Sequence, residues 1–212
     1  MKDSEKEILK TTSISMCDIT DEFFDIAMTN KVLACDTETT GLKWKENSIQ
    51  TVQLYIPNQV LQIVKISHTP PSKIIELIKN PKIQIIFHHA MFDLRFMYYH
   101  WKVYASNVSC TKIASKILNP NIKQHNLKFL LKEKLDILIN KDLATSDWSK
   151  KELNEQQILY AAKDVFYLPN LFAVLESELE NINKLELVRS CFNHIPTRVV
   201  LDVDSYGDIY TY

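Results

Sequence analysis

The pattern of hydrophobic and polar residues in the first half of the chain predicts a β-sheet. Four segments are short and apolar or alternate with a period of two, as strands do: residues 31–36, 49–56, 59–66 and 83–87. The Pro57-Asn58 turn between the second and third segments predicts a hairpin. Residues 1–30 are polar and irregular apart from an amphipathic stretch over 21–28. We therefore expect the first strand to begin near residue 31.

Helical periodicity dominates the remainder of the chain. It covers residues 72–79, 89–100, 111–118, 126–134, 155–180 and 184–192. Ser72 and Asn154 stand where an N-cap is expected, at the start of two of these helices. Strands with helices on either side, followed by a helical second half, indicate an α/β fold with a mixed sheet.

Prolines and polar segments set the expected limits of the later elements. Asn119-Pro120 is expected to separate two helices. Pro169 is expected to kink or divide the longest helix, and Pro196 to end the last one. Residues 136–150 have the pattern of a loop, and residues 199–203 that of a last strand.

Composition and charge narrow the range of functions. The chain has 212 residues, a formal net charge of -1 and only two glycines, Gly41 and Gly207. Glycine-rich dinucleotide fingerprints and phosphate loops need clustered glycines, so both kinds of nucleotide-binding site are excluded. Binding of long nucleic acid through one broad basic surface is disfavoured, because it rests on many phosphate contacts.

The cysteines and the N-terminal sequence indicate the compartment. Cys17, Cys35, Cys110 and Cys191 form no C-x-x-C pair, which argues against a zinc knuckle. Two disulfides would be open to a secreted protein, but the first ten residues mix both charges and lack an apolar signal region. No apolar run approaches the roughly 18 residues of a membrane span. We expect a reduced, cytoplasmic chain without a membrane partner.

Five side chains in three short motifs are candidates for one site. Asp36 and Glu38 are two residues apart at the end of a predicted strand, so both carboxylates project from one face. Asp93 follows another strand, and Tyr160 and Asp164 stack on one helix face at i,i+4 spacing. Taken singly, each has an ordinary interpretation as a turn cap, a solvated helix acid or a core aromatic. Taken together, they could converge on one cleft.

The negative charge of four converging carboxylates would need to be balanced by positive charge. Two carboxylates ~5 Å apart repel by about 3 kcal/mol at an effective dielectric constant of 20. Two divalent cations would neutralise four such groups, and ligands that are all oxygen favour Mg²⁺ or Mn²⁺ over zinc. Such a pair activates water and stabilises the leaving oxygen of a phosphodiester.

The order of these motifs resembles that of the DEDD 3′–5′ exonucleases, in the subgroup whose last motif carries tyrosine. D-x-E begins at residue 36, H-x-x-x-F-D at 88 and Y-x-x-x-D at 160. Segments further along the chain, over 110–116, 125–128 and 146–165, are similar to the ribonuclease D catalytic domain. The resemblance covers about residues 30–212. It implies a ribonuclease H-like mixed sheet flanked by helices.

Within that family the chain resembles the compact nanoRNase C enzymes. The likeness rests on residues 110–116 and 191–198 and on the short distance between the last predicted helix and the end of the sequence. This likeness implies a substrate of very short RNA, chiefly dinucleotides, and a homo-oligomer in the form of an octameric ring. We accordingly expect an N-terminal extension over 1–30, packed on or beside a catalytic domain over 31–183. A C-terminal helix and Tyr-rich tail over 184–212 would then contact other subunits.

The resemblance also implies roles for individual residues. Two cations, Mg²⁺ or Mn²⁺, would be bound by the four acids: Asp36, Glu38, Asp93 and Asp164. Tyr160 would orient the attacking water rather than act as its base, because a phenol of pKa about 10 is mostly protonated at neutral pH. Hydrolysis at the 3′ end would release nucleoside 5′-monophosphates.

Substrate contacts are expected at four further residues. Leu42 matches the leucine that wedges between the two terminal bases in this family, and Gly41 fits a sharp turn beside it. Thr37 lies between the two acids of the first motif, and His89 stands where the family often has Asn. His125 either meets the 5′-phosphate of the substrate or belongs to an exposed helix start.

Alternatives remain open for the substrate and for the tail. One rival function is a DNA or longer-RNA exonuclease. Another is a non-catalytic binding module, which predicts the loss of at least one acid, whereas all four acids and the tyrosine are present. The tail tyrosines Tyr206, Tyr210 and Tyr212 either fold back onto the domain or cover a neighbouring subunit.

Overall fold

The computed structural model describes residues 3–139, 146–150 and 152–211. Within these residues one six-stranded sheet has the order β1-β4-β3-β2-β5-β6. Its strands are β1 (Thr12–Met16), β2 (Val32–Thr39), β3 (Ile49–Tyr55), β4 (Leu61–Lys65), β5 (Gln84–Phe87) and β6 (Val108–Cys110). β3 runs antiparallel to both β2 and β4, and the other neighbours are parallel. The predicted mixed sheet and its hairpin are confirmed.

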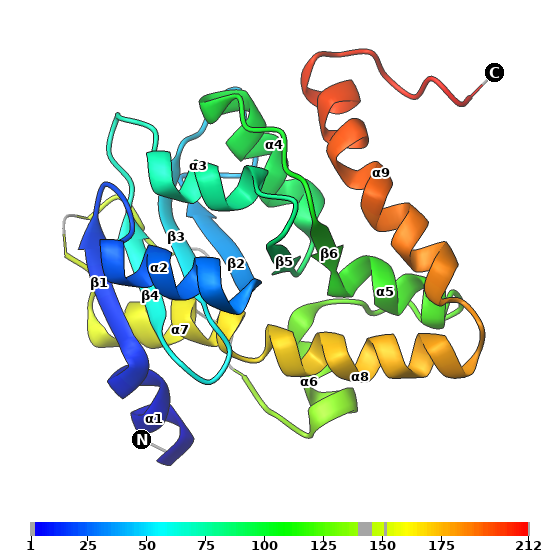
Figure 1. Ribbon diagram of the computed structural model, residues 1–212, viewed down its shortest axis with the longest axis horizontal. Helices are drawn as coiled ribbons and strands as arrows, with labels where there is room; N and C mark the ends of the chain where they lie inside the picture. The colour runs from blue at the N-terminus through cyan, green and yellow to red at the C-terminus, as the bar shows by residue number, and fades with distance from the viewer. Residues whose placement is uncertain (1–2, 140–145, 151, 212) are drawn as a thin grey trace.

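Helices cover the sheet and extend beyond one end of it. They are α1 (Asp3–Thr11), α2 (Asp21–Asn30), α3 (Ser72–Lys79), α4 (Ala90–Trp101), α5 (Thr111–Leu118), α6 (Leu127–Leu135), α7 (Glu155–Phe166), α8 (Leu168–Asn181) and α9 (Leu185–Val203). In Figure 1, α2 and α3 lie in front of the sheet and α7 behind it, while α8 and α9 extend to the right.

The long helix predicted over 155–180 starts and divides as expected. Asn154 caps α7 in a reciprocal capping box, in which its Oδ1 accepts from Gln157 N at 2.9 Å and Gln157 Oε1 accepts from Asn154 N at 3.1 Å. The break falls at Tyr167, and Pro169 lies in the first turn of α8. Proline is tolerated there because the first N–H groups of a helix have no intrahelical partner.

Two strands lie where the sequence pattern predicts none. β1 falls in the polar N-terminal segment and pairs in parallel with β4, with Ile14 opposite Ile63. β6 has only three residues and pairs with β5 at the other edge of the sheet. Both are edge strands, defined by backbone pairing to a neighbour distant in sequence rather than by an alternating apolar pattern.

The C-terminal predictions are wrong in two respects. Helix α9 continues through Pro196, and residues 199–203 belong to this helix and form no strand. Buried residues recur along α9 every three or four positions, at Val188, Phe192, Ile195, Val199 and Val203. This spacing buries one helical stripe, and its packing outweighs the one backbone hydrogen bond that proline removes.

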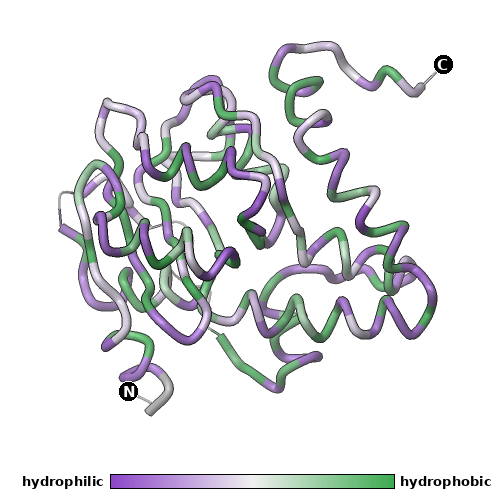
Figure 2. The backbone as a smooth tube through the Cα atoms, in the orientation of Figure 1, coloured by the Kyte–Doolittle hydropathy of each residue, from purple (hydrophilic) through white to green (hydrophobic). Residues whose placement is uncertain are grey.

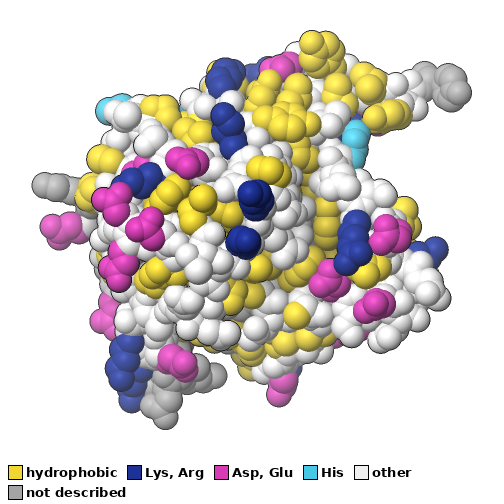
Figure 3. Space-filling view, viewed as in Figure 1, with side chains coloured by type: hydrophobic (Ala, Val, Ile, Leu, Met, Phe, Trp, Pro, Cys, Tyr) yellow, Lys and Arg dark blue, Asp and Glu magenta, His cyan; other side chains and the backbone are white. Residues whose placement is uncertain are grey.

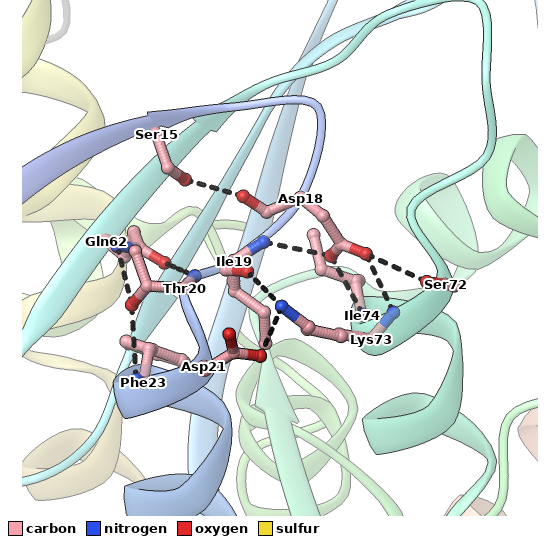
Figure 4. A network of polar contacts seen from close by, with 10 residues as sticks. All are labelled: Ser15, Asp18, Ile19, Thr20, Asp21, Phe23, Gln62, Ser72, Lys73 and Ile74. Carbon is pink, nitrogen blue, oxygen red and sulfur yellow. Dashed lines mark hydrogen bonds and ion pairs between the residues drawn. The ribbon is translucent and has the colours of Figure 1, made fainter.

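The cap of α3 also differs from the prediction. Pro71 is the N-cap residue, with no side-chain hydrogen bond of its own, so Ser72 does not cap the helix. Instead, the carboxylate of Asp18 accepts from Lys73 N at 2.8 Å and from Ile74 N at 3.2 Å. Figure 4 shows this carboxylate between the two segments, with the Ser72 hydroxyl also donating to it. A residue 54 positions away thus completes the helix start.

Apolar residues concentrate on the central strands and on the inner sides of the helices (Figure 2). Among the described residues, the stretch Glu155–Asn181 is long and apolar enough, by length and composition, to cross a membrane. Half of its most apolar window is buried inside the protein, and the stretch is divided between α7 and α8. Packing in the core therefore accounts for its hydropathy.

Candidate active site

Three of the predicted acids converge on one face of the sheet. Asp36 and Glu38 project from the same side of β2, and α7, which carries Asp164, packs across β2, β3 and β4. One carboxylate oxygen from each of these three residues lies within 4.8 Å of the other two. The strand and the helix therefore build one carboxylate cluster from residues more than 120 positions apart in the chain.

Asp93 joins the same cavity from the first turn of α4. Its side chain is 2% exposed, and its Oδ1 accepts a hydrogen bond from the Thr37 hydroxyl at 2.7 Å. Burial raises the pKa of Asp93 to about 7; the Thr37 bond opposes this rise and the neighbouring Asp164 adds to it. Backbone hydrogen bonds at Thr37 and Asp93 also lower the pKa, but burial outweighs all of these bonds.

Tyr160 lies one helical turn before Asp164 and also lines the cavity. Burial raises the pKa of its phenol far above the usual value, and the nearby acids Asp164, Glu38 and Asp36 raise it further. The phenol therefore stays protonated across the physiological range. It can donate a hydrogen bond but cannot serve as a base.

These side chains line a cavity of about 550 Å³. Its lining consists of Asp36, Thr37, Glu38, His88, His89, Phe92, Asp93, Lys112, Asn126, Leu127, Lys128, Tyr160 and Asp164. β2 and α7 contribute acids, whereas α5 and α6 contribute Lys112 and Lys128. A ligand in this cavity would thus meet both negative and positive side chains.

The donor set fits divalent cations. The clustered ligand atoms of Asp36, Glu38 and Asp164 are all carboxylate oxygens, which hard cations such as Mg²⁺ and Mn²⁺ prefer. Burial is the main cause of the raised pKa of Asp93, and the negative charge of Asp164 adds to it. Added positive charge would relieve this repulsion, so the residues present suit a cation site.

Thr37 and His89, two of the predicted substrate contacts, both line the cavity. His89 precedes α4 with a φ of 74°, in the left-handed region. Asn, Asp and His are enriched there, so His89 adopts this backbone conformation with little strain. Burial lowers the pKa of His89 to about 4, and nearby Lys112 lowers it too. The ring is therefore neutral at pH 7.

Leu42 lies outside this lining, on the loop that follows β2, and its side chain is 79% exposed. Leu42 is therefore not a core residue. Asn47 shapes the loop, because its Oδ1 accepts from Lys43 N at 3.1 Å and its carbonyl accepts from His100 Nε2 at 2.8 Å. A Cβ on Gly41 would lie 2.6 Å from Asn47 Oδ1, so a larger residue here would displace the Asn47 side chain.

The structure does not bring His125 into the cavity. Its ring is buried, with Nε2 donating to the Ile122 carbonyl at 2.8 Å and Nδ1 2.8 Å from Ser115 Oγ. Both ring nitrogens are thus engaged within the protein. This geometry fits a residue that holds the turn before α6 rather than one that meets a substrate.

Among the polar lining residues that sequence reasoning missed are Lys112, Asn126 and Lys128. Each belongs to a segment that resembles ribonuclease D, over 110–116 or 125–128. The signal was therefore present, but only the fold shows that the first turns of α5 and α6 face the acids.

Comparison with known sequences identifies relatives across most of the chain. The sequence profile of a 3′–5′ exonuclease family matches residues 11–180. Ribonuclease D of Haemophilus influenzae is 28% identical over 158 residues, which make up 74% of this chain and 39% of that protein. DNA polymerase I of Aquifex aeolicus is 30% identical over 153 residues, 71% of this chain and 25% of that protein. The chain thus spans well under two thirds of the length of these relatives.

Comparison with solved structures finds similar proteins over nearly the whole chain. NrnC of Brucella melitensis is 32% identical with a TM-score of 0.89, covering 96% of this chain and 99% of that one. RNase D of Escherichia coli shares the fold, with a TM-score of 0.76 at 20% identity over 88% of this chain and 50% of that one. With the family profile matched and all four acids and the tyrosine lining one cavity, the chain belongs to the DEDD 3′–5′ exonuclease family.

Proposed function

We propose that the chain is a metal-dependent 3′–5′ exoribonuclease that hydrolyses short oligoribonucleotides, chiefly dinucleotides, to nucleoside 5′-monophosphates. The observation that carries the proposal is the likeness to NrnC of Brucella melitensis over 95% of this chain, in structures that hold pGG in one case and Mg²⁺ in another. The cavity of about 550 Å³ also suits a small ligand, for which pockets of roughly 300–1,000 Å³ are usual.

Two divalent cations, Mg²⁺ or Mn²⁺, belong to this proposal. Asp36, Glu38 and Asp164 would hold them, together with Asp93, which lines the same cavity. Bound there, the cations would lower the pKa of water and stabilise the charge that develops on the leaving oxygen. They would also supply positive charge at the reacting phosphate, so that a short substrate needs no extended basic track.

The remaining residues would bind and orient the reactants. The protonated phenol of Tyr160 would donate a hydrogen bond and so orient the attacking water. Neutral His89 would offer the substrate one donor and one acceptor, as an Asn amide does. Lys112 and Lys128 would attract phosphate, and exposed Leu42 would pack between the two terminal bases.

A second function has support of its own. Ribonuclease D of Haemophilus influenzae and DNA polymerase I of Aquifex aeolicus are both relatives, and they point to processing of longer RNA or to removal of DNA 3′ ends. The near-neutral charge of this chain favours the short-RNA function, because tight binding of long strands draws on many basic contacts.

The two functions are separated by turnover of 5′-labelled RNA and DNA of two, three, seven and twenty nucleotides with Mg²⁺ supplied. We expect kcat/KM for the RNA dinucleotide to exceed that for the twenty-residue RNA by about tenfold or more, a difference of about 1.4 kcal/mol. Asp36→Asn serves as the inactive control. Preference for the twenty-residue RNA, or for DNA, would overturn the dinucleotide assignment.

We also propose that the chain forms a homo-oligomer through its C-terminal region. Leu187, Tyr206, Ile209 and Tyr210 are large apolar residues exposed there, and Figure 3 shows apolar side chains gathered over the end of α9 and the tail. The expected result of light scattering at micromolar concentration is a mass several times that of one subunit. A monomer would contradict the proposal.

A further inference from the structure

Lys65 is a lysine buried in an apolar strand. All five positions of β4 are buried, and Lys65 is 6% exposed. Removing an ammonium group from water is unfavourable unless a partner compensates. Lys65 pairs with Thr51, and Thr51 pairs with Glu38, so all three lie on one face of the sheet. This buried lysine therefore shares a face with the catalytic acids.

The compensating partner is the segment over residues 146–148. Lys65 Nζ donates to the Trp148 carbonyl oxygen at 2.6 Å. From α7, the buried Gln157 donates through Nε2 to Ser146 Oγ at 2.9 Å and to the Asp147 carbonyl oxygen at 3.1 Å. Side chains from the sheet and from the catalytic helix thus hold this segment by three hydrogen bonds. We call this arrangement the clamp.

Trp148 connects the clamp to the active site. Its side chain is 2% exposed, and its ring centroid lies 5.8 Å from that of Tyr160, with the planes at 43°. Trp148 Nε1 has no hydrogen-bond partner among the described residues, so packing and the held backbone position the indole. The backbone of Tyr160 is fixed by α7, and its ring packs against Trp148.

We infer that the clamp formed by Lys65 and Gln157 around residues 146–148 positions the Tyr160 phenol for the reaction. The inference rests on the proposed function, in which Tyr160 orients the attacking water. Neither Lys65 nor Gln157 lines the cavity, so both are positioning residues. Without the clamp the indole can shift and the phenol samples more orientations. This slows the chemical step without weakening substrate binding.

Two substitutions each remove part of the clamp. Lys65→Met keeps an unbranched apolar chain and loses the donor. Gln157→Glu keeps the oxygen that accepts from Asn154 N and loses the NH₂ group. In dinucleotide assays we expect kcat to fall about tenfold, KM to stay within about twofold, and the half-saturating Mg²⁺ concentration to stay unchanged. In a Tyr160→Phe background the same substitutions should change kcat by less than about twofold, because no hydroxyl remains to position.

Lys134→Met is the matched control. Lys134 is another lysine with little exposure, bonded to Glu178 on α8 at 2.8 Å, and it does not line the cavity. We expect it to lower the melting temperature about as much as Lys65→Met while leaving kcat unchanged. If Lys65→Met fails to fold, Gln157→Glu carries the test, with folding checked by thermal melting.

Each outcome separates this inference from the proposed function. An unchanged kcat in the clamp variants, or an equal loss of kcat in the Tyr160→Phe background, would overturn the clamp. A shift in the half-saturating Mg²⁺ concentration would overturn it in favour of an electrostatic role for Lys65. If Tyr160→Phe alone keeps wild-type kcat, the role of Tyr160 in the proposed function fails instead.

Discussion

Two aspartates, Asp18 and Asp93, show how one residue type serves the fold in one region and chemistry in another. Asp18 accepts from the backbone N–H groups of Ile19, Lys73 and Ile74 at 2.9, 2.8 and 3.2 Å. Two of these groups belong to the first turn of α3, where the helix dipole also favours a negative charge. Hydrogen-bond donors of the protein itself thus stabilise the negative charge of Asp18, as Figure 4 shows.

Asp93 is more deeply buried and less well compensated. Hydrogen bonds from the Thr37 hydroxyl and from the backbone of Thr37 and Asp93 support it, but they do not offset its burial, and the nearby charge of Asp164 opposes them. Burial raises its pKa to about 7. A carboxylate whose pKa is strongly raised despite its hydrogen bonds is a candidate for function, because strongly shifted pKa values cluster at functional sites. The comparison predicts that changes at the two sites have opposite effects on activity and stability.

The largest expected effect is on activity, at the acid cluster. Asp164→Asn should lower kcat at least ~10⁴-fold, about 5 kcal/mol in the activation barrier, because it removes one of the clustered cation ligands. The same change should leave the melting temperature unchanged or raise it, since a repelling charge is lost. Initial rates on a dinucleotide and a thermal melt would check both. A variant that loses stability while keeping a tenth of wild-type activity would break the comparison.

The next effect is on the pH dependence of stability in the metal-free protein. The carboxyl of Asp93 has a pKa of about 7 when folded and about 3.8 as the reference value. The folded state therefore holds a proton that the unfolded state has released, and stability should fall as pH rises from about 4 to about 7. The fall should be no more than about 4 kcal/mol, and Asp93→Asn should abolish it. Urea unfolding at several pH values, with chelator present, would measure it.

Removal of Asp18 should cost stability and spare catalysis. Asp18→Ala leaves the N–H groups of Lys73 and Ile74 without their acceptor, so the free energy of unfolding should fall by about 2–3 kcal/mol. Asp18→Asn keeps an acceptor oxygen and should cost less. Below its melting temperature each variant should turn over a dinucleotide at the wild-type rate. A specific loss of kcat in fully folded protein would show that the two regions are coupled.

The same two aspartates show how far the sequence alone could predict the structure. Asp93 is found by its motif, since the family spacing places it beside Asp36 and Glu38 whatever the surrounding packing. The role of Asp18 leaves no local pattern, because its partners lie 55 and 56 positions further along the chain. The helix start at Ser72 was therefore predicted correctly while its cap was assigned to the wrong residue.

Other differences have a similar tertiary origin. Pro196 stops a helix by local rules, and Val199–Val203 is β-branched enough to suggest a strand, yet the stripe that Val188 and Phe192 begin keeps α9 helical. Lys65 occupies an alternating segment that predicts a strand, but its partner is known only once the 146–148 segment is placed. Local pattern thus predicts elements and motifs, whereas caps and supporting contacts depend on packing.

The smallest expected effect is stabilisation by the cation itself. Mg²⁺ at ten times its Kd should raise the free energy of unfolding by about 1.4 kcal/mol, because it binds the folded acid cluster and not the unfolded chain. Asp18→Asn should gain as much as the wild-type protein, whereas Asp36→Asn and Asp164→Asn should gain little. The readout is the melting temperature during a Mg²⁺ titration at pH 8, where Asp93 is mostly ionised in the metal-free protein. Equal stabilisation of all four proteins would mean that Mg²⁺ acts elsewhere, and the burial of Asp93 with a raised pKa would then need another explanation.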